Sequence, residues 1–215
     1  MGTKKMDKKE QIKIIIKRLK KEYPSMKTAL DFKTPIQMLV ATILSAQCTD
    51  VRVNMVTPAL FKKYKSAEAF ARADINVFEN EIHSTGFYRH KARNIINSAR
   101  MIVRKFNGRV PDTMDELLEL PGVARKTANV VLHNAYGKVE GIVVDTHVIR
   151  LSQRLGVTKN IDPAKIEKDL MEIVPRAEWG TISYILIDHG RKICRAIKPN
   201  HAACVLNDIC PSRNI

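Results

Sequence analysis

The stretch Leu120–Lys126, which reads Leu-Pro-Gly-Val-Ala-Arg-Lys, predicts a tight turn between two helices. Before it, Thr113–Leu120 starts with a capping-box pattern and predicts a short helix. After it, Arg125–Tyr136 predicts a second helix. The start of that second helix can bind a phosphate through unpaired backbone N–H groups and the helix dipole. Such a contact carries no sequence information, and the alternative is an ordinary corner between two helices.

The rest of the chain also predicts helices. Apolar residues recur with helical spacing in Met6–Glu22, Ile36–Ala46, Val51–Tyr64, Arg89–Phe106, Asp145–Leu155, Ala164–Val174 and Thr181–Asp188. N-caps are expected at Ser66, Asp74 and Asp162. Pro58 is expected to break or restart its helix, and Ile142–Val144 is too short to establish a strand. We therefore predict an all-α fold.

Composition narrows the class of protein. The chain has 215 residues, of which 45% are apolar, and this argues against disorder. The length allows one globule or two small lobes. A formal net charge of +15 favours binding to nucleic acid or to an anionic membrane. The alternative is a soluble protein that is basic without such a partner. No apolar run approaches the ~20 residues of a membrane span, and the start does not resemble a signal peptide. We expect an intracellular protein.

Two polar residues stand out as candidates for chemistry. Lys126 falls in the first turn of the helix after the hairpin, among small and apolar neighbours. The positive end of the helix dipole disfavours an ammonium there, partial burial would do so further, and an amine must lose its proton to act as a nucleophile. Asp145 follows an apolar run in Val144–His147. It could cap a helix, and it could also stabilise a developing cation or move a proton.

The cysteines indicate a metal site. Three of the four, Cys194, Cys204 and Cys210, lie in the last 22 residues, together with His201, in the spacing C-x6-H-x2-C-x5-C. Three thiols and one imidazole are a sufficient ligand set for one metal centre. Chance clustering of reduced cysteines is the alternative.

Taken together, these motifs resemble the endonuclease III family of helix-hairpin-helix base-excision DNA glycosylases. The resemblance covers nearly the whole chain and includes Leu44–Asp50, Leu120–Val131, Val144–His147, His189–Arg191 and the cysteine tail. It implies an all-α fold of two lobes with a DNA cleft between them. Residues 28–138 would form a six-helix barrel lobe with the hairpin. Residues 1–27 plus 139–215 would form a helical lobe with an iron–sulfur cluster loop.

The resemblance also implies roles for individual residues. Lys126 would attack C1′ of the sugar, and Asp145 would assist departure of the base and turnover of the covalent intermediate. Gln47 would fill the gap left by an extruded nucleotide, and Phe87 would wedge between bases. The hairpin would anchor a phosphate, and the residues expected to contact DNA there and in the Asp145 motif are Leu120, Gly122, Ala124, Arg125, Thr127 and His147.

Two residues depart from the family pattern. His201 stands where the family has the second cysteine of the tail, and imidazole can ligate iron. We expect a [4Fe–4S] cluster with His201 as one ligand, and a zinc site as the alternative; Cys48 is not expected to replace the missing thiol. Ala124 stands where the hairpin usually has a second glycine. An alanine is tolerated at this position when its φ is negative.

The leading hypothesis is a bifunctional DNA glycosylase/AP lyase that removes oxidised pyrimidines from double-stranded DNA. A lysine at position 126 predicts the lyase activity, because an amine nucleophile forms a Schiff base that permits β-elimination. The alternatives are a glycosylase for mismatched thymine or uracil, a non-catalytic DNA-binding protein, and a zinc-stabilised structural protein. We expect a monomer in the cytoplasm, associated with the nucleoid and with damaged or abasic DNA.

Overall fold

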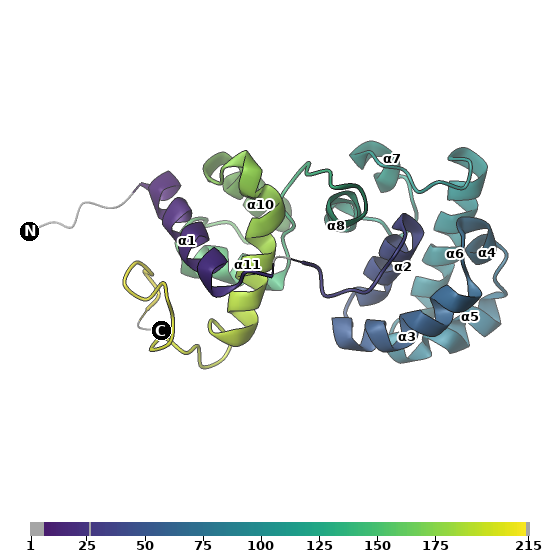
Figure 1. Ribbon diagram of the computed structural model, residues 1–215, viewed down its shortest axis with the longest axis horizontal. Helices are drawn as coiled ribbons and strands as arrows, with labels where there is room; N and C mark the ends of the chain where they lie inside the picture. Colours follow the sequence, from purple (N-terminus) through teal and green to yellow (C-terminus); the bar gives the residue numbers. More distant parts are fainter. Residues whose placement is uncertain (1–6, 26, 214–215) are drawn as a thin grey trace, which may run out of the picture. The chain divides into compact units, whose positions relative to one another are not determined.

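The protein is all-α over residues 7–25 and 27–213, the part that this computed structural model describes (Figure 1). No strand occurs in these residues, which confirms the predicted fold class. The helices run over Lys8–Glu22 (α1), Pro35–Ser45 (α2), Asp50–Lys63 (α3), Ala67–Ala71 (α4), Ile75–Ile82 (α5), Tyr88–Lys105 (α6), Met114–Leu118 (α7), Arg125–Tyr136 (α8), Thr146–Arg154 (α9), Pro163–Ile173 (α10) and Trp179–Lys192 (α11), with short 3-10 helices at His83–Thr85 (η1) and Arg176–Glu178 (η2). Among the described residues, none of the helices combines the length and the hydropathy of a membrane-spanning segment.

The chain divides into two compact units, one comprising Thr28–Glu140 and the other Met1–Lys27 with Gly141–Ile215. In the first unit, which we call the hairpin unit, α2 is buried along most of its length. Helix α6 packs against α2, α4 and α5. Phe70 and Phe78 are both fully buried, and their rings meet edge to face at a centroid distance of 6.0 Å.

The second unit, which we call the tail unit, has its own hydrophobic core. Helix α1 contributes four buried apolar side chains and packs against α10 and α11, which both contact α9. Leu206 from the irregular segment after α11 is 1% exposed and joins the same core. Burial of this apolar side chain therefore anchors the C-terminal segment independently of any metal.

Most of the predicted helix caps are confirmed. The side chains of Ser66, Asp74 and Asp162 each accept a backbone N–H from the first turn of their helices. The capping box at Thr113 is wrong in part. Thr113 Oγ1 lies 2.7 Å from Glu116 Oε2, to which it donates, and it caps no backbone N–H.

The expected break at Pro58 is also wrong, because α3 continues through this residue. Proline removes one intrahelical hydrogen bond and crowds the preceding turn. Val53 before the proline and Leu60 after it are both buried in the core of the hairpin unit. Packing on both sides of Pro58 therefore outweighs its local cost.

Removing the cap of α10 should destabilise the tail unit. Asp162→Ala deletes the acceptor for the N–H of Lys165, at 3.0 Å, and should cost about 1 kcal/mol in the free energy of unfolding. Asp162→Asn retains an acceptor and is the matched control. Urea unfolding followed by circular dichroism measures both. Equal stability of the two variants would contradict the capping role.

Candidate functional site

Helix α6 supports the hairpin between α7 and α8. Ser98 Oγ donates to the carbonyl of Pro121 at 2.7 Å. Gly122 has φ +78°, and a Cβ built there would lie 2.8 Å from Cβ of Asn94. Position 122 therefore requires glycine twice, for its left-handed backbone and for the close approach of α6.

The hairpin leads directly into α8, whose first turn carries the predicted nucleophile. Ala124 has φ −95° and ψ 169°. Its φ is negative, as an alanine at this position requires, so its methyl group causes no backbone strain. Arg125 and Lys126 are exposed, so the partial burial considered for Lys126 is not found. Ala124 offers no side-chain acceptor to this first turn. An N-terminus without a side-chain cap suits an external anion.

Several of the residues predicted to contact DNA line one groove of the hairpin unit. The groove has a volume of about 420 Å³. Its lining comprises Thr42, Ile43, Ala46, Gln47, Phe87, His90, Lys91, Asn94, Gly122 and Thr127. The structure thus brings the hairpin together with two loops that lie far from it in sequence, at Gln47 and at Phe87.

Gln47 and Phe87 share an uncommon backbone conformation. Their φ values are 52° and 48°, in the left-handed region, which costs a residue other than glycine roughly 1–3 kcal/mol. The side chain of Phe87 is 67% exposed, and Gln47 is exposed as well. Their surroundings must fix these two backbones while leaving the side chains free to reach a partner.

The predicted acid, Asp145, lies in the tail unit. It is half-buried and caps α9, with Oδ1 accepting the N–H of Val148 at 2.8 Å. Two residues further along, Nδ1 of His147 lies 3.1 Å from Nη2 of Arg150. Because an arginine can only donate, His147 accepts there. The pKa of His147 is lowered, mainly by burial. The charge of Asp145 raises this pKa, and the charges of Arg150 and Arg191 lower it.

Helix α9 also fixes the start of the cysteine tail. Arg150 donates to the carbonyls of Gly190 and Cys194, at 3.0 and 3.1 Å for Nη2. One turn later, Nη1 of Arg154 lies 3.3 Å from Sγ of Cys194 and donates to the carbonyl of Arg195 at 2.7 Å. The helix that Asp145 caps at its start therefore contacts the first predicted metal ligand, Cys194, at its end.

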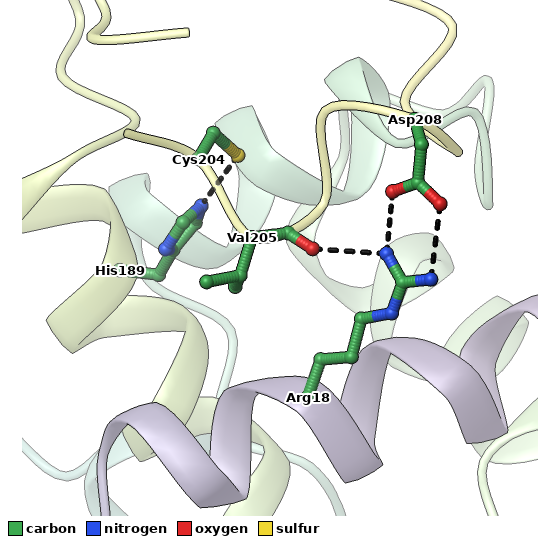
Figure 2. Close-up of polar contacts among 5 residues, drawn as sticks. All are labelled: Arg18, His189, Cys204, Val205 and Asp208. Atoms are coloured by element: carbon green, nitrogen blue, oxygen red, sulfur yellow. Dashed lines mark hydrogen bonds and ion pairs between the residues drawn. The ribbon is translucent and has the colours of Figure 1, made fainter. Parts of the chain in front are cut away.

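The later part of the tail is held by α1 and α11 (Figure 2). Arg18 donates to the carbonyl of Val205 at 2.9 Å and forms a bidentate pair with the carboxylate of Asp208. His189 is 2% exposed, and its Nε2 lies 3.4 Å from Sγ of Cys204. Burial lowers the pKa of His189 to about 4, so its imidazole is neutral. The hydroxyl of Tyr23 lies 3.1 Å from Nδ1 of His189. If the hydroxyl donates to Nδ1, the proton of the neutral imidazole is on Nε2, which then donates to Sγ of Cys204.

The four predicted metal ligands line one cavity of the tail unit, and they are Cys194, His201, Cys204 and Cys210. Burial raises the pKa of Cys204 and Cys210, and the charge of Cys194 raises both further. A bound cation would relieve this mutual repulsion of thiolates. The donor set therefore fits an iron–sulfur cluster or zinc in chemical kind. In residues 7–25 and 27–213, no three such side chains are arranged to hold a metal ion.

Cys48 belongs to the other unit, where it packs against the core of α2 and its neighbours. The structure thus gives it a packing role of its own. The sequence did not predict the structural roles of three further polar residues, Arg18, Lys91 and Arg154. Each lies on a helix rich in basic residues, so residue type alone could not separate them from solvated lysines and arginines.

The hairpin glycine gives a stability test with an internal control. Gly122→Ala should destabilise the hairpin unit through its positive φ and through the contact with Asn94. Gly137 also has a positive φ, +65°, at the other end of α8, but a Cβ there meets nothing within 4 Å. Both alanine variants should lose about 1–2 kcal/mol from backbone strain, and Gly122→Ala should lose more, in urea unfolding. Equal losses would contradict the close approach of α6.

Comparison with known proteins identifies the family. The model of the HhH-GPD superfamily of base excision DNA repair proteins matches residues 40–176. Endonuclease III of Synechocystis is 56% identical over 95% of this chain and 94% of its own length. Endonuclease III of Bacillus subtilis is 42% identical over 94% and 92%.

Solved structures agree with these relatives. A non-covalent endonuclease III–DNA complex matches with a TM-score of 0.92 and 42% identity over 97% of each chain. A trapped covalent endonuclease III–DNA intermediate matches with the same TM-score and identity over 97% of this chain and 98% of that one. Family model, sequence relatives and solved structures all lead to one conclusion: this chain belongs to the endonuclease III family of base excision DNA glycosylase/AP lyases.

Proposed function

We propose that the chain removes oxidised pyrimidines from double-stranded DNA and then cleaves the abasic site, with Lys126 as the nucleophile. The observation that carries this proposal is the place of Lys126, exposed in the first turn of α8, directly after a hairpin built against α6. The endonuclease III structures of similar fold include one bound to DNA and one trapped as a covalent intermediate.

The chemistry begins with extrusion of the damaged nucleotide, because a stacked base cannot present its glycosidic bond. The neutral amine of Lys126 attacks C1′, and the bond between C1′ and the base breaks as the base leaves with its electron pair. Opening of the sugar ring gives a Schiff base between Lys126 and C1′. The 2′ proton is then acidic, and its removal expels the 3′ phosphate by β-elimination.

We propose that Asp145 assists this sequence. The hydrogen bond from Val148 fixes the carboxylate through Oδ1 and does not use Oδ2. A fixed carboxylate stabilises the cation that develops at the sugar and can move a proton in the later steps. Because the cap of α9 fixes it, the acid is oriented before substrate arrives.

The groove at the hairpin is the proposed DNA-binding surface. The hairpin residues Leu120, Gly122, Ala124 and Arg125 would bind a phosphate, while Gln47 and Phe87 would fill and wedge the duplex. Thr127 lines the same groove. We assign His147 to DNA from its place beside Asp145. The two units, which divide after Glu140, would correspond to the two expected lobes, residues 28–138 and residues 1–27 plus 139–215. We propose a monomer that acts on damaged or abasic DNA in the cytoplasm, at the nucleoid.

Borohydride trapping tests the nucleophile. With a duplex that contains thymine glycol, the wild-type chain should form a covalent adduct, and Lys126→Gln should form none because an amide cannot form a Schiff base. Lys165→Gln, an exposed lysine on α10, is the control for loss of one charge and should trap normally. Denaturing gel electrophoresis measures the adduct.

Full trapping by Lys126→Gln would contradict the assignment. A wild-type chain that cleaves G·T or G·U duplexes but not thymine glycol would instead be a mismatch glycosylase. Tight, salt-sensitive binding without any cleavage would indicate a non-catalytic DNA-binding protein.

We propose that the tail holds a [4Fe–4S] cluster with His201 and the three tail cysteines as ligands. The cavity that these four residues line together supports the proposal. Such a cluster would fix the tail, and α9 would connect it through Arg154 to Asp145. Zinc is the alternative occupant.

Metal analysis with variants of position 201 tests this assignment. The purified chain should contain iron and sulfide and show visible charge-transfer absorption. His201→Cys should retain the cluster with a changed reduction potential, since imidazole raises the potential of a cluster relative to thiolate. His201→Ala should lose iron more readily to a chelator. Stoichiometric zinc without iron, or an unchanged potential in His201→Cys, would contradict the proposal.

A further inference from the structure

The hairpin unit contains a buried cation that the proposed chemistry does not use. Lys91 on α6 is only 4% exposed. Its Nζ donates to the carbonyl of Leu44 and to that of Thr85, both at 2.8 Å. Burial lowers the pKa of this lysine. A buried ammonium costs free energy unless hydrogen bonds satisfy it, and the carbonyls of Leu44 and Thr85 do so here.

The two carbonyls belong to the two loops that carry Gln47 and Phe87. Leu44 is in the last turn of α2, three residues before Gln47, where helical carbonyls lack intrahelical partners. Thr85 is the last residue of η1, two residues before Phe87. The N–H of Lys91 also donates to the carbonyl of Phe87 at 3.1 Å. One side chain thus joins two segments that are about forty residues apart in sequence.

Both loops need such a tie. Gln47 and Phe87 each adopt a left-handed backbone, a conformation that persists only where the surroundings enforce it. Lys91 Nζ also places a positive charge at the C-terminal end of α2, which favours the helix dipole. The same groove is lined by Gln47, Phe87 and Lys91.

We propose that Lys91 is a positioning residue that holds the Gln47 and Phe87 loops in one fixed arrangement, so that both side chains enter the duplex together at an extruded nucleotide. This inference rests on the proposed function. Because it is buried, Lys91 acts through the two loops and makes no phosphate contact of its own.

The test compares Lys91→Met with Arg104→Met, which removes the same charge from an exposed position on α6. Lys91→Met should bind a duplex with a tetrahydrofuran abasic-site analogue more weakly by about tenfold or more, equivalent to about 1.4 kcal/mol. Binding to undamaged duplex should stay within about twofold, and the salt slope of log K should not change, because no phosphate contact is lost. Arg104→Met should retain the preference for the abasic analogue.

Two further measurements separate positioning from general destabilisation. In a Gln47→Ala/Phe87→Ala background, Lys91→Met should have little additional effect, since residues that act as one unit are non-additive. Fluorescence of 2-aminopurine beside the lesion should rise less on binding of Lys91→Met than of wild type. Lys91→Gln retains a side-chain donor and replaces Lys91→Met should the latter fail to fold; it should show a smaller loss in the same direction.

An unchanged preference for the abasic analogue in a folded Lys91 variant would overturn the proposal. So would a decrease of about one in the salt slope of log K, which would indicate a lost phosphate contact. An additive effect of Lys91→Met in the Gln47→Ala/Phe87→Ala background would overturn it as well. Wild-type trapping by borohydride keeps this outcome distinct from failure of the proposed function. When wild type traps and Lys91 variants bind normally, only the positioning role is wrong. When wild type does not trap, the proposed function is wrong.

Discussion

One face of helix α6 carries the interactions on which the hairpin unit depends. Phe87, Lys91, Asn94 and Ser98 follow one another at the three- and four-residue spacing that places side chains on one side of a helix. Phe87 is the N-cap residue of the helix, and Lys91 binds the carbonyls of two loops. Asn94 lies against Gly122, and Ser98 binds the carbonyl of Pro121. Three loops from distant parts of the sequence are therefore fixed by a single rigid element.

The tail unit repeats this arrangement with α9. Its N-cap is Asp145, and one face carries His147, Arg150 and Arg154 toward α11 and the first tail cysteine. Gly190 allows the close approach, because a Cβ there would lie 2.8 Å from Nδ1 of His147. The proposed acid and the first proposed metal ligand, Cys194, are thus fixed by the same helix. Loss of order in the tail would reach Asp145 through α9.

Sequence patterns predicted the all-α fold, the caps at Ser66, Asp74 and Asp162, and the motifs around Lys126 and Asp145, because each depends on a few neighbouring residues. They failed where tertiary packing prevails. Buried side chains on both sides of Pro58 keep α3 continuous. At Thr113 the reason is local, because its hydroxyl binds Glu116 in place of the backbone. Lys91 and Arg18 could not be distinguished from surface cations, since their partners are carbonyls or acids far away in sequence.

Hydrogen–deuterium exchange tests most directly whether the three loops on α6 form one DNA-binding surface. The measurement compares the free chain with its complex with a duplex that contains an uncleavable abasic-site analogue. We predict slower exchange on binding in residues 45–48, 85–88 and 120–126 together. Protection confined to the lysine-rich helix α1, with all three loops unchanged, would contradict it.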